Sequence, residues 1–292
     1  MMGLFSKSFD PETDLPDLSG NVIIVTGGNS GVGCAAIQYL ARRGAKVYMA
    51  ARNEEKAKAA IEKRPEGREE GSGGVHGEGA ALGHRWLLTP FSIQEIAVVN
   101  YFSPYVFIRT LLPLLKRTAQ EPDSDQLKLT SEGHRLPPNN CHFRTIEDFN
   151  REFKGELLAS NKRYNFTKYM GVLHVKELQK RLNAEGAPII VTAVHPGIVN
   201  TDGVQNFANS SGTFKAPLYS FIANAFFTSP EKGAYSTVFA AAAPEIREDP
   251  MYKGGYIVPP GKLGSVYPPT EDPELGKELW ETTEKILADI GV

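Results

Sequence analysis

Tyr164 and Lys168, four residues apart, are the side chains of this 292-residue sequence best suited to acid–base chemistry. At that spacing two side chains of an α-helix lie on the same face. An ammonium group near a phenol stabilises the phenolate and lowers the phenol pKa from its usual value of about 10. Tyr164 is therefore a candidate proton donor or acceptor near neutral pH. An ordinary amphipathic helix face is the alternative interpretation of the same pair.

A glycine-rich segment near the N-terminus is the second candidate site. Residues 22–25 form a short, β-branched apolar run that predicts a strand buried on both faces. Residues 32–43 have apolar side chains at helical spacing and precede Gly44, a favourable helix C-cap, and residues 45–50 predict a second strand. In such a βαβ unit, N–H groups at the helix N-terminus bind a dinucleotide pyrophosphate. A glycine turn without any ligand, as found in other α/β proteins, is the alternative.

Length and composition favour one large, soluble α/β domain over residues 1–292. A net charge of -2 gives no electrostatic reason to expect nucleic acid as a partner. Cys34 and Cys141 lack any metal-site spacing, and two lone cysteines suit a reducing compartment, so we expect no metal and a cytoplasmic location. The sequence shows no signal peptide, and no stretch approaches the ~20 apolar residues of a bilayer span.

Two motifs, TGxxxGxG from Thr26 and YxxxK from Tyr164, together resemble the short-chain dehydrogenase/reductase family. The likeness covers most of the chain and is closest to the retinol-dehydrogenase-like and WW-domain-oxidoreductase-like branch, with its fungal members. Asn100 begins an apolar helix, Ser131 ends a strand, and the segment 195–201 follows another strand, all in the family's order. The resemblance implies a doubly wound Rossmann-type parallel sheet and hydride transfer between a nicotinamide and an alcohol, aldehyde or ketone.

The resemblance also implies roles for single residues. Tyr164 would exchange a proton with the substrate oxygen, and Lys168 would lower its pKa and bind the nicotinamide ribose. Ser131 would hold the substrate oxygen, and Asn100 would support a water chain that returns the proton. Ser131 could instead cap a turn, and Asn100 could be a plain helix-start residue. The cofactor-binding residues would be Thr26, Gly27, Asn29, Ser30, Gly31, Val32, Gly33, Arg52, Asn100, Tyr164, Lys168, Pro196, Gly197, Val199 and Thr201.

The residue after the second strand indicates which cofactor is used. In nucleotide folds that prefer NAD, a carboxylate there accepts the ribose 2′-hydroxyl, whereas a cation accommodates the 2′-phosphate of NADP. This chain has Arg52 at that place and no acid before Glu54. An arginine fork suits a phosphate, so NADP is favoured over NAD. The alternative is that Arg52 is a solvated surface charge.

The family pattern breaks between Arg52 and Asn100. A helix is predicted from Glu54 to Lys63, but neither a third nor a fourth strand is recognisable after it. Residues 67–83 contain seven glycines and predict a flexible stretch. Only 48 positions separate Arg52 from Asn100, where the expected elements need roughly 65. We therefore expect a sheet that is incomplete around strands 3 and 4, with residues 84–89 as a poor replacement strand.

Two insertions, residues 132–162 and 202–230, are expected on the substrate side. The first contains a helix-like stretch at 146–149. The second contains the apolar run 216–227, which would suit a lipophilic pocket, a peripheral membrane contact or a covered core helix. The strand expected before Ser131 is poor, because Gln126-Leu127-Lys128-Leu129 has a lysine where an interior strand should be apolar.

The function favoured by the sequence is an NADP(H)-dependent oxidoreductase that acts on a lipophilic small molecule. A homo-oligomer is compatible with this interpretation. The alternative is a catalytically impaired relative, or a truncated gene model, with weak or no cofactor binding.

Overall fold

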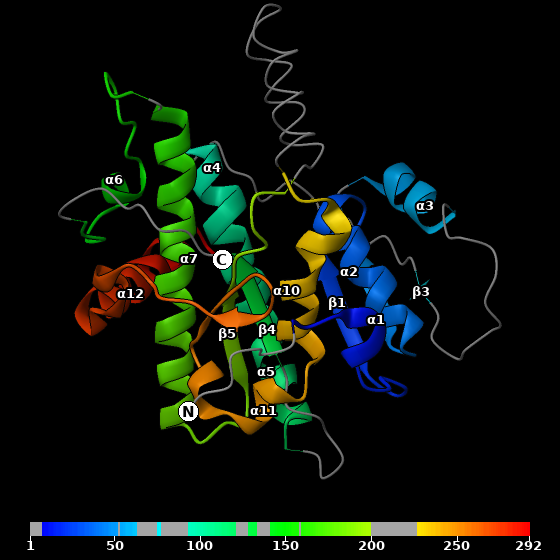
Figure 1. Cartoon of the computed structure of the whole chain (residues 1–292). Helices are drawn as coiled ribbons and strands as arrows, with labels where there is room; N and C mark the ends of the chain where they lie inside the picture. Colours follow the sequence, from blue (N-terminus) through cyan, green and yellow to red (C-terminus); the bar gives the residue numbers. More distant parts are fainter. Residues whose placement is uncertain are drawn as a thin grey trace, which may run out of the picture. The chain divides into compact units, whose positions relative to one another are not determined.

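The computed structural model describes residues 8–51, 53–62, 75–76, 93–120, 128–132, 141–157, 159–199 and 227–292 (Figure 1). The chain divides into two compact units, and each is described by itself. Unit 1 comprises the described residues within 1–84, 196–246 and 258–262. Unit 2 comprises those within 85–195, 247–257 and 263–292. The prediction of one domain over 1–292 stays a prediction.

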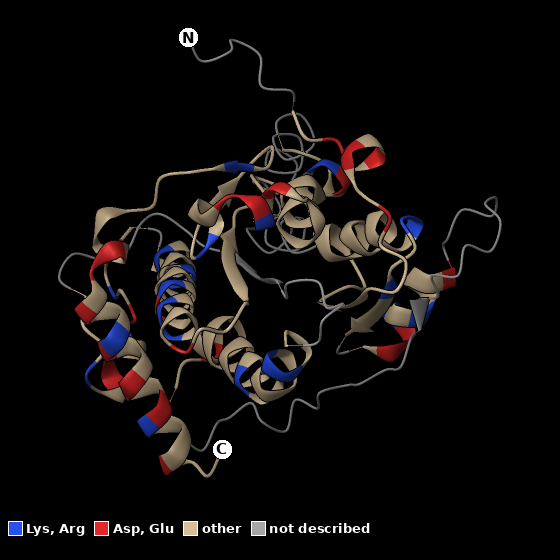
Figure 2. Cartoon of the chain, turned by 90° about the horizontal axis from the view of Figure 1, so that it is seen from below, with Lys and Arg blue, Asp and Glu red and all other residues tan. Residues whose placement is uncertain are grey.

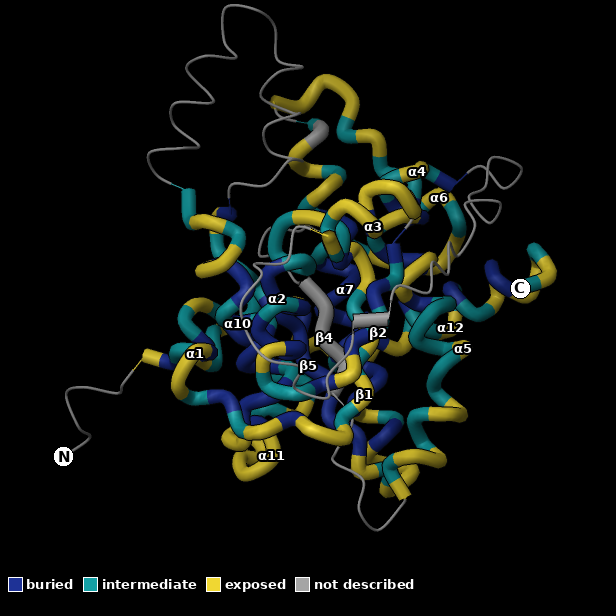
Figure 3. Tube along the Cα trace, turned by 90° about the vertical axis from the view of Figure 1, so that its right-hand side faces the viewer, coloured by how far each residue is buried: buried dark blue, intermediate teal, exposed yellow. Residues whose placement is uncertain are grey.

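Unit 1 contains a three-stranded sheet with helices from both ends of the sequence. The strands follow the order β1-β2-β3, and both pairs are parallel. Its elements are α1 (Pro11–Asp14), β1 (Val22–Thr26), α2 (Gly31–Arg42), β2 (Lys46–Ala50), α3 (Glu54–Glu62), β3 (Val75–His76) and α10 (Pro230–Ala242). The predicted strands, the glycine turn and the helices after β1 and β2 are thus confirmed to within a residue or two. Buried residues gather where α2 packs against α10 (Figure 3).

The expectation of an incomplete sheet is confirmed in part, because the described strands form two separate sheets. A third strand is present but has only two residues: Val75 and His76 pair in parallel with Val47 and Tyr48, inside the glycine-rich stretch. The sequence hides it because two residues are too short to show a pattern. The prediction that β1 is buried on both faces is wrong, since Val22 is 62% exposed and Ile24 is 44% exposed. Among the described residues β1 pairs only with β2.

Unit 2 contains a four-stranded sheet in the order β4-β5-β6-β7. Its elements are α4 (Glu95–Ala97), the π-helical turn η2 (Val98–Phe102), α5 (Ser103–Thr118), β4 (Lys128–Glu132), α6 (Ile146–Phe149), α7 (Ala159–Ala184), β5 (Ile190–Val194), η3 (Pro250–Tyr252), β6 (Tyr256–Val258), β7 (Lys262–Leu263), η4 (Pro268–Glu271) and α12 (Pro273–Asp289). A short helix, α11 (Glu245–Glu248), joins segments of the two units. All five residues of β5 are buried, and α7 packs on β4 and β5 (Figure 3). The poor strand before Ser131 therefore does form, paired in parallel with β5.

The core of unit 2 is rich in aromatic side chains. Phe143 and Phe149, from the predicted insertion 132–162, are 0% and 1% exposed. Phe143 stacks on Phe166 of α7, with ring centroids 5.6 Å apart, and Phe149 lies 5.1 Å from Phe102 of η2. The helix at 146–149 forms as predicted and carries a capping box between Thr145 and Asp148. The described part of the insertion therefore contributes to the core that supports α7.

The helical run α4–η2–α5, from Glu95 to Thr118, is long and apolar. Its most apolar 18-residue window has a mean hydropathy of 1.3 and is 22% buried. By length and composition alone this run is sufficient to cross a membrane, a test that core helices of soluble proteins also pass. The expectation that no stretch approaches this length is therefore not met. Acidic and basic residues are interspersed along the helices (Figure 2).

Candidate active site

The glycine turn of unit 1 has the backbone geometry that a pyrophosphate site needs. Gly27 and Gly31 have φ angles of +67° and +55°, in the left-handed region that favours glycine. A Cβ atom on Gly33 would lie 2.5 Å from the carbonyl oxygen of Gly27, so this position admits no side chain. Ser30 is the N-cap of α2, but its side chain makes no capping hydrogen bond. The Ser30 side chain thus does not cap the first N–H groups of α2, and such groups at a helix N-terminus are suited to an anionic ligand.

The remaining predicted residues of this turn lie where the sequence places them. Thr26 ends β1, Asn29 lies in the turn, and Val32 lies in the first turn of α2. The Gly27 N–H donates to the carbonyl oxygen of Ala50, 2.9 Å away, which ties the start of the turn to the end of β2. The first turn of α2 contains no acidic residue. A negative charge there would oppose a phosphate, so its absence agrees with the predicted ligand.

Unit 1 also brings the Pro196–Val199 loop to the first turn of α2, although 164 positions separate Gly33 from Gly197 in the sequence. Gly197 has a φ of +88° and Val199 is 7% exposed. A Cβ atom on Gly233 of α10 would lie 2.6 Å from Val199 and 3.3 Å from Val32. Gly233 thus lets α10 approach both of the segments that are predicted to bind the cofactor. Thr201 lies outside the described residues, and so does Arg52.

In unit 2, helix α7 presents Tyr164 and Lys168 on one face, as their spacing predicts. The Lys168 Nζ lies over the Tyr164 ring, 5.2 Å from its centroid. Tyr164 as a whole residue is 44% exposed. A partly exposed phenol with an ammonium beside it is an arrangement suited to proton exchange with a substrate oxygen.

Asn100 lies in the π-helical turn η2, and a threonine of α7 connects it to the same face. The Asn100 Nδ2 donates to the Thr167 Oγ1 at 3.1 Å, and the Thr167 hydroxyl donates to the Tyr164 carbonyl oxygen at 2.7 Å. Asn100 is therefore joined through Thr167 to the backbone of Tyr164, whose ring lies under Lys168. The sequence did not indicate the π-helical turn or the role of Thr167, because both depend on packing between elements. π-helical turns are frequent at functional sites.

Ser131 is placed only by its backbone, because its side chain lies outside what the structure describes. It is in β4, where its partner across the sheet is Ala193 of β5. Helix α7 packs on β4, so the strand that carries Ser131 lies against the helix that carries Tyr164. The role of its hydroxyl stays a prediction.

The C-terminal helix α12 also bonds to η2 and α5. The Tyr101 and Thr283 hydroxyls are 2.9 Å apart and buried, and the Tyr105 hydroxyl donates to Glu284 Oε1 at 2.6 Å. Arg109 also pairs with Glu284, at 3.0 Å. Burial raises the pKa of Tyr101 far above its ordinary value, so this hydroxyl stays protonated. These contacts fix the turn that carries Asn100.

His174 of α7 is buried between aromatic rings. It stacks on Trp280 of α12, with centroids 5.5 Å apart, and contacts Tyr105 at 4.8 Å. Neither ring nitrogen has a hydrogen-bond partner among the described residues. Burial lowers the pKa of His174 to about 4, so the imidazole is neutral at physiological pH. Its place among these rings makes it a packing residue of the core.

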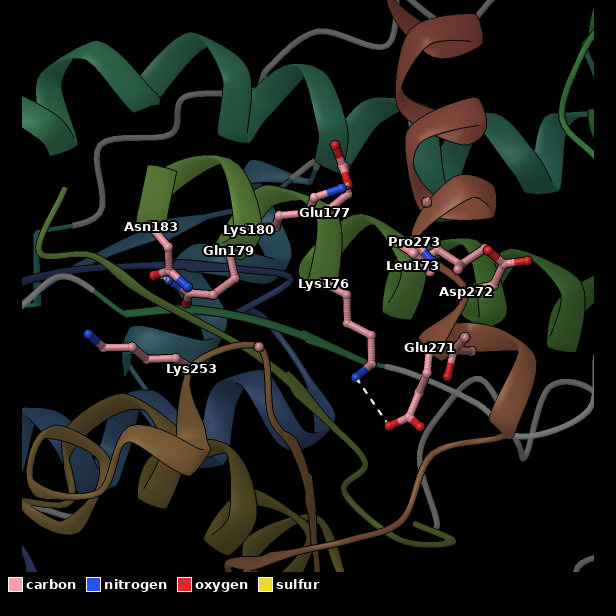
Figure 4. Close-up of a pocket in the computed structure, with 13 residues that line it drawn as sticks. Leu173, Lys176, Glu177, Gln179, Lys180, Asn183, Lys253, Glu271, Asp272 and Pro273 are labelled. Carbon is pink, nitrogen blue, oxygen red and sulfur yellow. Dashed lines mark hydrogen bonds and ion pairs between the residues drawn. The ribbon is translucent and has the colours of Figure 1, made fainter. Parts of the chain in front are cut away.

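A shallow groove of about 290 Å³ lies on unit 2 beside the second half of α7 (Figure 4). Lysines and acidic residues both line it, and Lys176 pairs with Glu271 at 3.8 Å (Figure 4). Among the lining residues of α7, Leu173 is nearest in sequence to Tyr164, and at 1.5 Å per residue it is about 13.5 Å away along the helix. None of the predicted site residues lines this groove. Among the described residues, no cluster of histidine, cysteine and acidic residues could hold a metal ion.

Comparison with known proteins matches residues 21–72 to a family model described as short chain dehydrogenase. A short-chain dehydrogenase/reductase of Armillaria gallica is 33% identical, with 98% of each chain covered. The chain belongs to the short-chain dehydrogenase/reductase family. By family it is an oxidoreductase that uses NAD or NADP. Another such enzyme, from Colletotrichum higginsianum, is 32% identical over 96% of this chain and 78% of the relative.

Solved structures show the same Rossmann-type fold. An uncharacterized protein of Mycobacterium paratuberculosis has a TM-score of 0.65 at 20% identity, with 97% of this chain and 98% of that chain covered. L-sorbose reductase of Gluconobacter frateurii, solved with NADPH and L-sorbose, has a TM-score of 0.54 at 16% identity, with 86% and 98% covered. At these identities the likeness concerns the fold alone.

The comparison with the Armillaria relative also concerns chain length. The alignment spans 318 positions, whereas this chain has 292 residues, so at least 26 aligned positions of the relative have no counterpart here. The usual lengths of helices, strands and loops imply that roughly twenty residues are missing between Arg52 and Asn100. The number of unmatched positions is of similar size.

Proposed function

We propose that this protein is an NADP(H)-dependent oxidoreductase that interconverts a lipophilic alcohol with its aldehyde or ketone, in the retinol-dehydrogenase-like branch of the family. The observation that carries the proposal is the joining of Asn100, Thr167 and Tyr164 by hydrogen bonds, with Lys168 over the Tyr164 ring. The uncapped first turn of α2 and the close-packed Gly33 support cofactor binding in unit 1.

Each residue has one task in the proposed reaction. A nicotinamide held by the glycine turn of unit 1 would supply or accept the hydride at the substrate carbon. Tyr164 donates its phenolic proton to the carbonyl oxygen during reduction and takes it back during oxidation. Lys168 favours the phenolate that remains. Ser131 donates a hydrogen bond to the substrate oxygen, and Asn100 holds the water that returns the proton to Tyr164.

The preference for NADP rests on Arg52, whose guanidinium suits a 2′-phosphate, and on the lack of an acid before Glu54. The lipophilic substrate class rests on the apolar run 216–227, which lies outside the described residues. A cytoplasmic location and assembly as a homo-oligomer are further parts of the proposal. A peripheral membrane contact is the alternative use of the same run.

A second candidate function is a catalytically impaired protein of the same fold. Two observations favour it: β1 has an exposed apolar face, and the chain lacks at least 26 positions of its Armillaria relative. In the family a further strand lies beside β1 and flanks the adenosine half of the cofactor. Without that strand, unit 1 would bind NADP weakly, and the chemistry of unit 2 would have no hydride donor.

The test combines binding with turnover. NADPH binding is measured by fluorescence, and turnover is followed as NADPH consumption with a panel of lipophilic aldehydes and ketones. Tyr164→Phe should retain NADPH binding and lose turnover by about 100-fold or more, because the proton donor is gone. Tyr169→Phe is the matched control, since Tyr169 is buried on the same helix and its hydroxyl has no hydrogen-bond partner among the described residues. Full activity of Tyr164→Phe would refute the assignment.

Arg52 offers a separate test of the cofactor. Arg52→Ala should weaken NADPH binding by about tenfold and leave NADH binding within about twofold, because only NADPH has the 2′-phosphate. Equal losses for both cofactors would contradict the proposed role of Arg52.

A further inference from the structure

Thr167 connects two elements of the candidate site. It joins the turn η2, which carries Asn100, to the helix α7, which carries Tyr164. Its side chain is 1% exposed and lies between α7 and η2. The Thr167 hydroxyl makes two hydrogen bonds. It accepts one from the Asn100 amide at 3.1 Å and donates one to the Tyr164 carbonyl oxygen at 2.7 Å. One hydroxyl therefore contacts both the Asn100 side chain and the backbone of Tyr164.

The second of these bonds acts on the backbone of Tyr164. A threonine hydroxyl that bonds to a carbonyl one turn earlier competes with the helix ladder and can bend the helix at that turn. Here that carbonyl belongs to Tyr164 itself. The bond is thus placed to set how the helix presents the Tyr164 side chain.

The other hydrogen bond, from Asn100 to Thr167, reaches the π-helical turn η2. A π-helical turn has one residue more than an α-helical turn. In η2 the Ser103 N–H bonds to the Val98 carbonyl oxygen, which encloses Asn100 in the wide turn. The next residue, Tyr101, is held at its hydroxyl by Thr283, which is 0% exposed. Two buried threonines from two helices therefore hold successive residues of η2.

We propose that Thr167 is a positioning residue for the reaction. Its hydroxyl keeps the Asn100 amide and the Tyr164 turn in fixed register, so that Asn100 can hold water beside the tyrosine and lysine. This inference rests on the function proposed above. A residue that only fills space at this position would need the shape of threonine but not its hydroxyl.

The experiment compares variants of the full chain that keep or remove the hydroxyl. Thr167→Val preserves the shape and removes both hydrogen bonds, and Thr167→Ser keeps the hydroxyl. Thr110→Val is the matched control, because the Thr110 hydroxyl makes the same type of bond, to the Val106 carbonyl oxygen at 2.8 Å, on an exposed helix face. For each variant, kcat, KM and NADPH affinity are measured with one carbonyl substrate of the wild type.

Thr167→Val should lower kcat about tenfold and leave KM and NADPH affinity within about twofold, whereas Thr167→Ser should keep kcat within about threefold of the wild type. A kcat of Thr167→Val equal to that of the wild type would overturn the inference. Equal losses in the Val and Ser variants would also overturn it, because the hydroxyl would then be irrelevant.

A double-mutant cycle and hydrogen exchange separate this inference from the proposed function. If Thr167 acts through Asn100, the Thr167→Val change should add little to Asn100→Ala, and additive effects would contradict this route. Amide exchange of residues 95–105 should increase in Thr167→Val and not in Thr110→Val. That readout needs no turnover. If the wild type proves inactive, the proposed function fails. Unchanged amide exchange of residues 95–105 in Thr167→Val would separately show that the Thr167 hydroxyl does not hold η2 in place.

Discussion

Strands β1 and β5 have similar sequences and very different surroundings. Both are five-residue parallel strands, Val-Ile-Ile-Val-Thr and Ile-Val-Thr-Ala-Val. Every residue of β5 is at most 2% exposed, whereas Val22 and Ile24 of β1 are 62% and 44% exposed. Strand β5 has partners on both edges, and β1 has one among the described residues. The burial of a strand is therefore decided by its neighbours as much as by its own side chains.

This difference separates the two halves of the proposed reaction. Strand β5 belongs to unit 2, where α7 carries Tyr164 and Lys168 on a well-packed core. Strand β1 leads into the glycine turn of unit 1, which would bind the cofactor. The proposed chemistry thus lies in the unit that contains the better buried of these two strands, and the following experiments address that contrast.

The largest effect should come from equal truncations in the two strands. Ile190→Ala removes a side chain that is 2% exposed in β5 and should lower the free energy of unfolding by about 2–5 kcal/mol. Ile24→Ala removes one that is 44% exposed in β1 and should cost less than about 1 kcal/mol. Urea unfolding of both variants measures the difference. Equal losses would show that β1 is covered as completely as β5.

A second contrast between the two units concerns their stability at acid pH. The pKa of His174 is lowered to about 4 in the folded protein, whereas an unfolded histidine titrates near 6.5. Below pH ~6.5 the unfolded chain binds the proton first, so stability is lost as the pH falls and the loss is complete near pH ~4. The free energy of unfolding should fall by roughly 3 kcal/mol over this range of pH.

The described histidine side chains, His142, His174 and His195, all lie in unit 2. Hydrogen exchange at pH 7 and pH 5 should therefore show unit 2 losing protection before unit 1. His174→Phe retains an aromatic ring in the stack and should remove this pH dependence. An unchanged pH dependence in that variant would exclude His174 as its source.

The smallest effect is expected for the glycine turn. In Gly33→Ala the new methyl group would meet the Gly27 carbonyl oxygen at 2.5 Å, and NADPH binding should weaken by about tenfold or more. Gly276→Ala in α12 is the matched control, because its nearest neighbour would be at 3.5 Å. The control should bind NADPH as the wild type does and be more stable by up to about 1 kcal/mol. Wild-type affinity in Gly33→Ala would show that this turn does not bind the cofactor.

The sequence predicted the local elements of the site well, because they depend on short-range patterns. Apolar periodicity and glycine placement were sufficient for β1, α2 and β2, and the YxxxK spacing for the face that carries Tyr164 and Lys168. The π-helical turn around Asn100 and the bridging role of Thr167 depend on contacts across 67 positions, which one sequence does not show. The exposure of β1 was missed because it depends on which strands lie beside it, and the part of the chain that the structure describes places only β2 there. Arg52, Thr201 and the Ser131 side chain lie outside the described residues, so their roles stay predictions.

The most direct test of this account is an NADPH titration of the folded wild-type protein, followed by fluorescence and by thermal shift. The central claim is that the glycine turn of unit 1 still binds the cofactor although β1 has a strand neighbour on only one edge among the described residues. The account predicts saturable binding of NADPH, with weaker binding of NADH. A chain that is folded by circular dichroism and shows no saturable NADPH binding would contradict the claim and favour the catalytically impaired alternative.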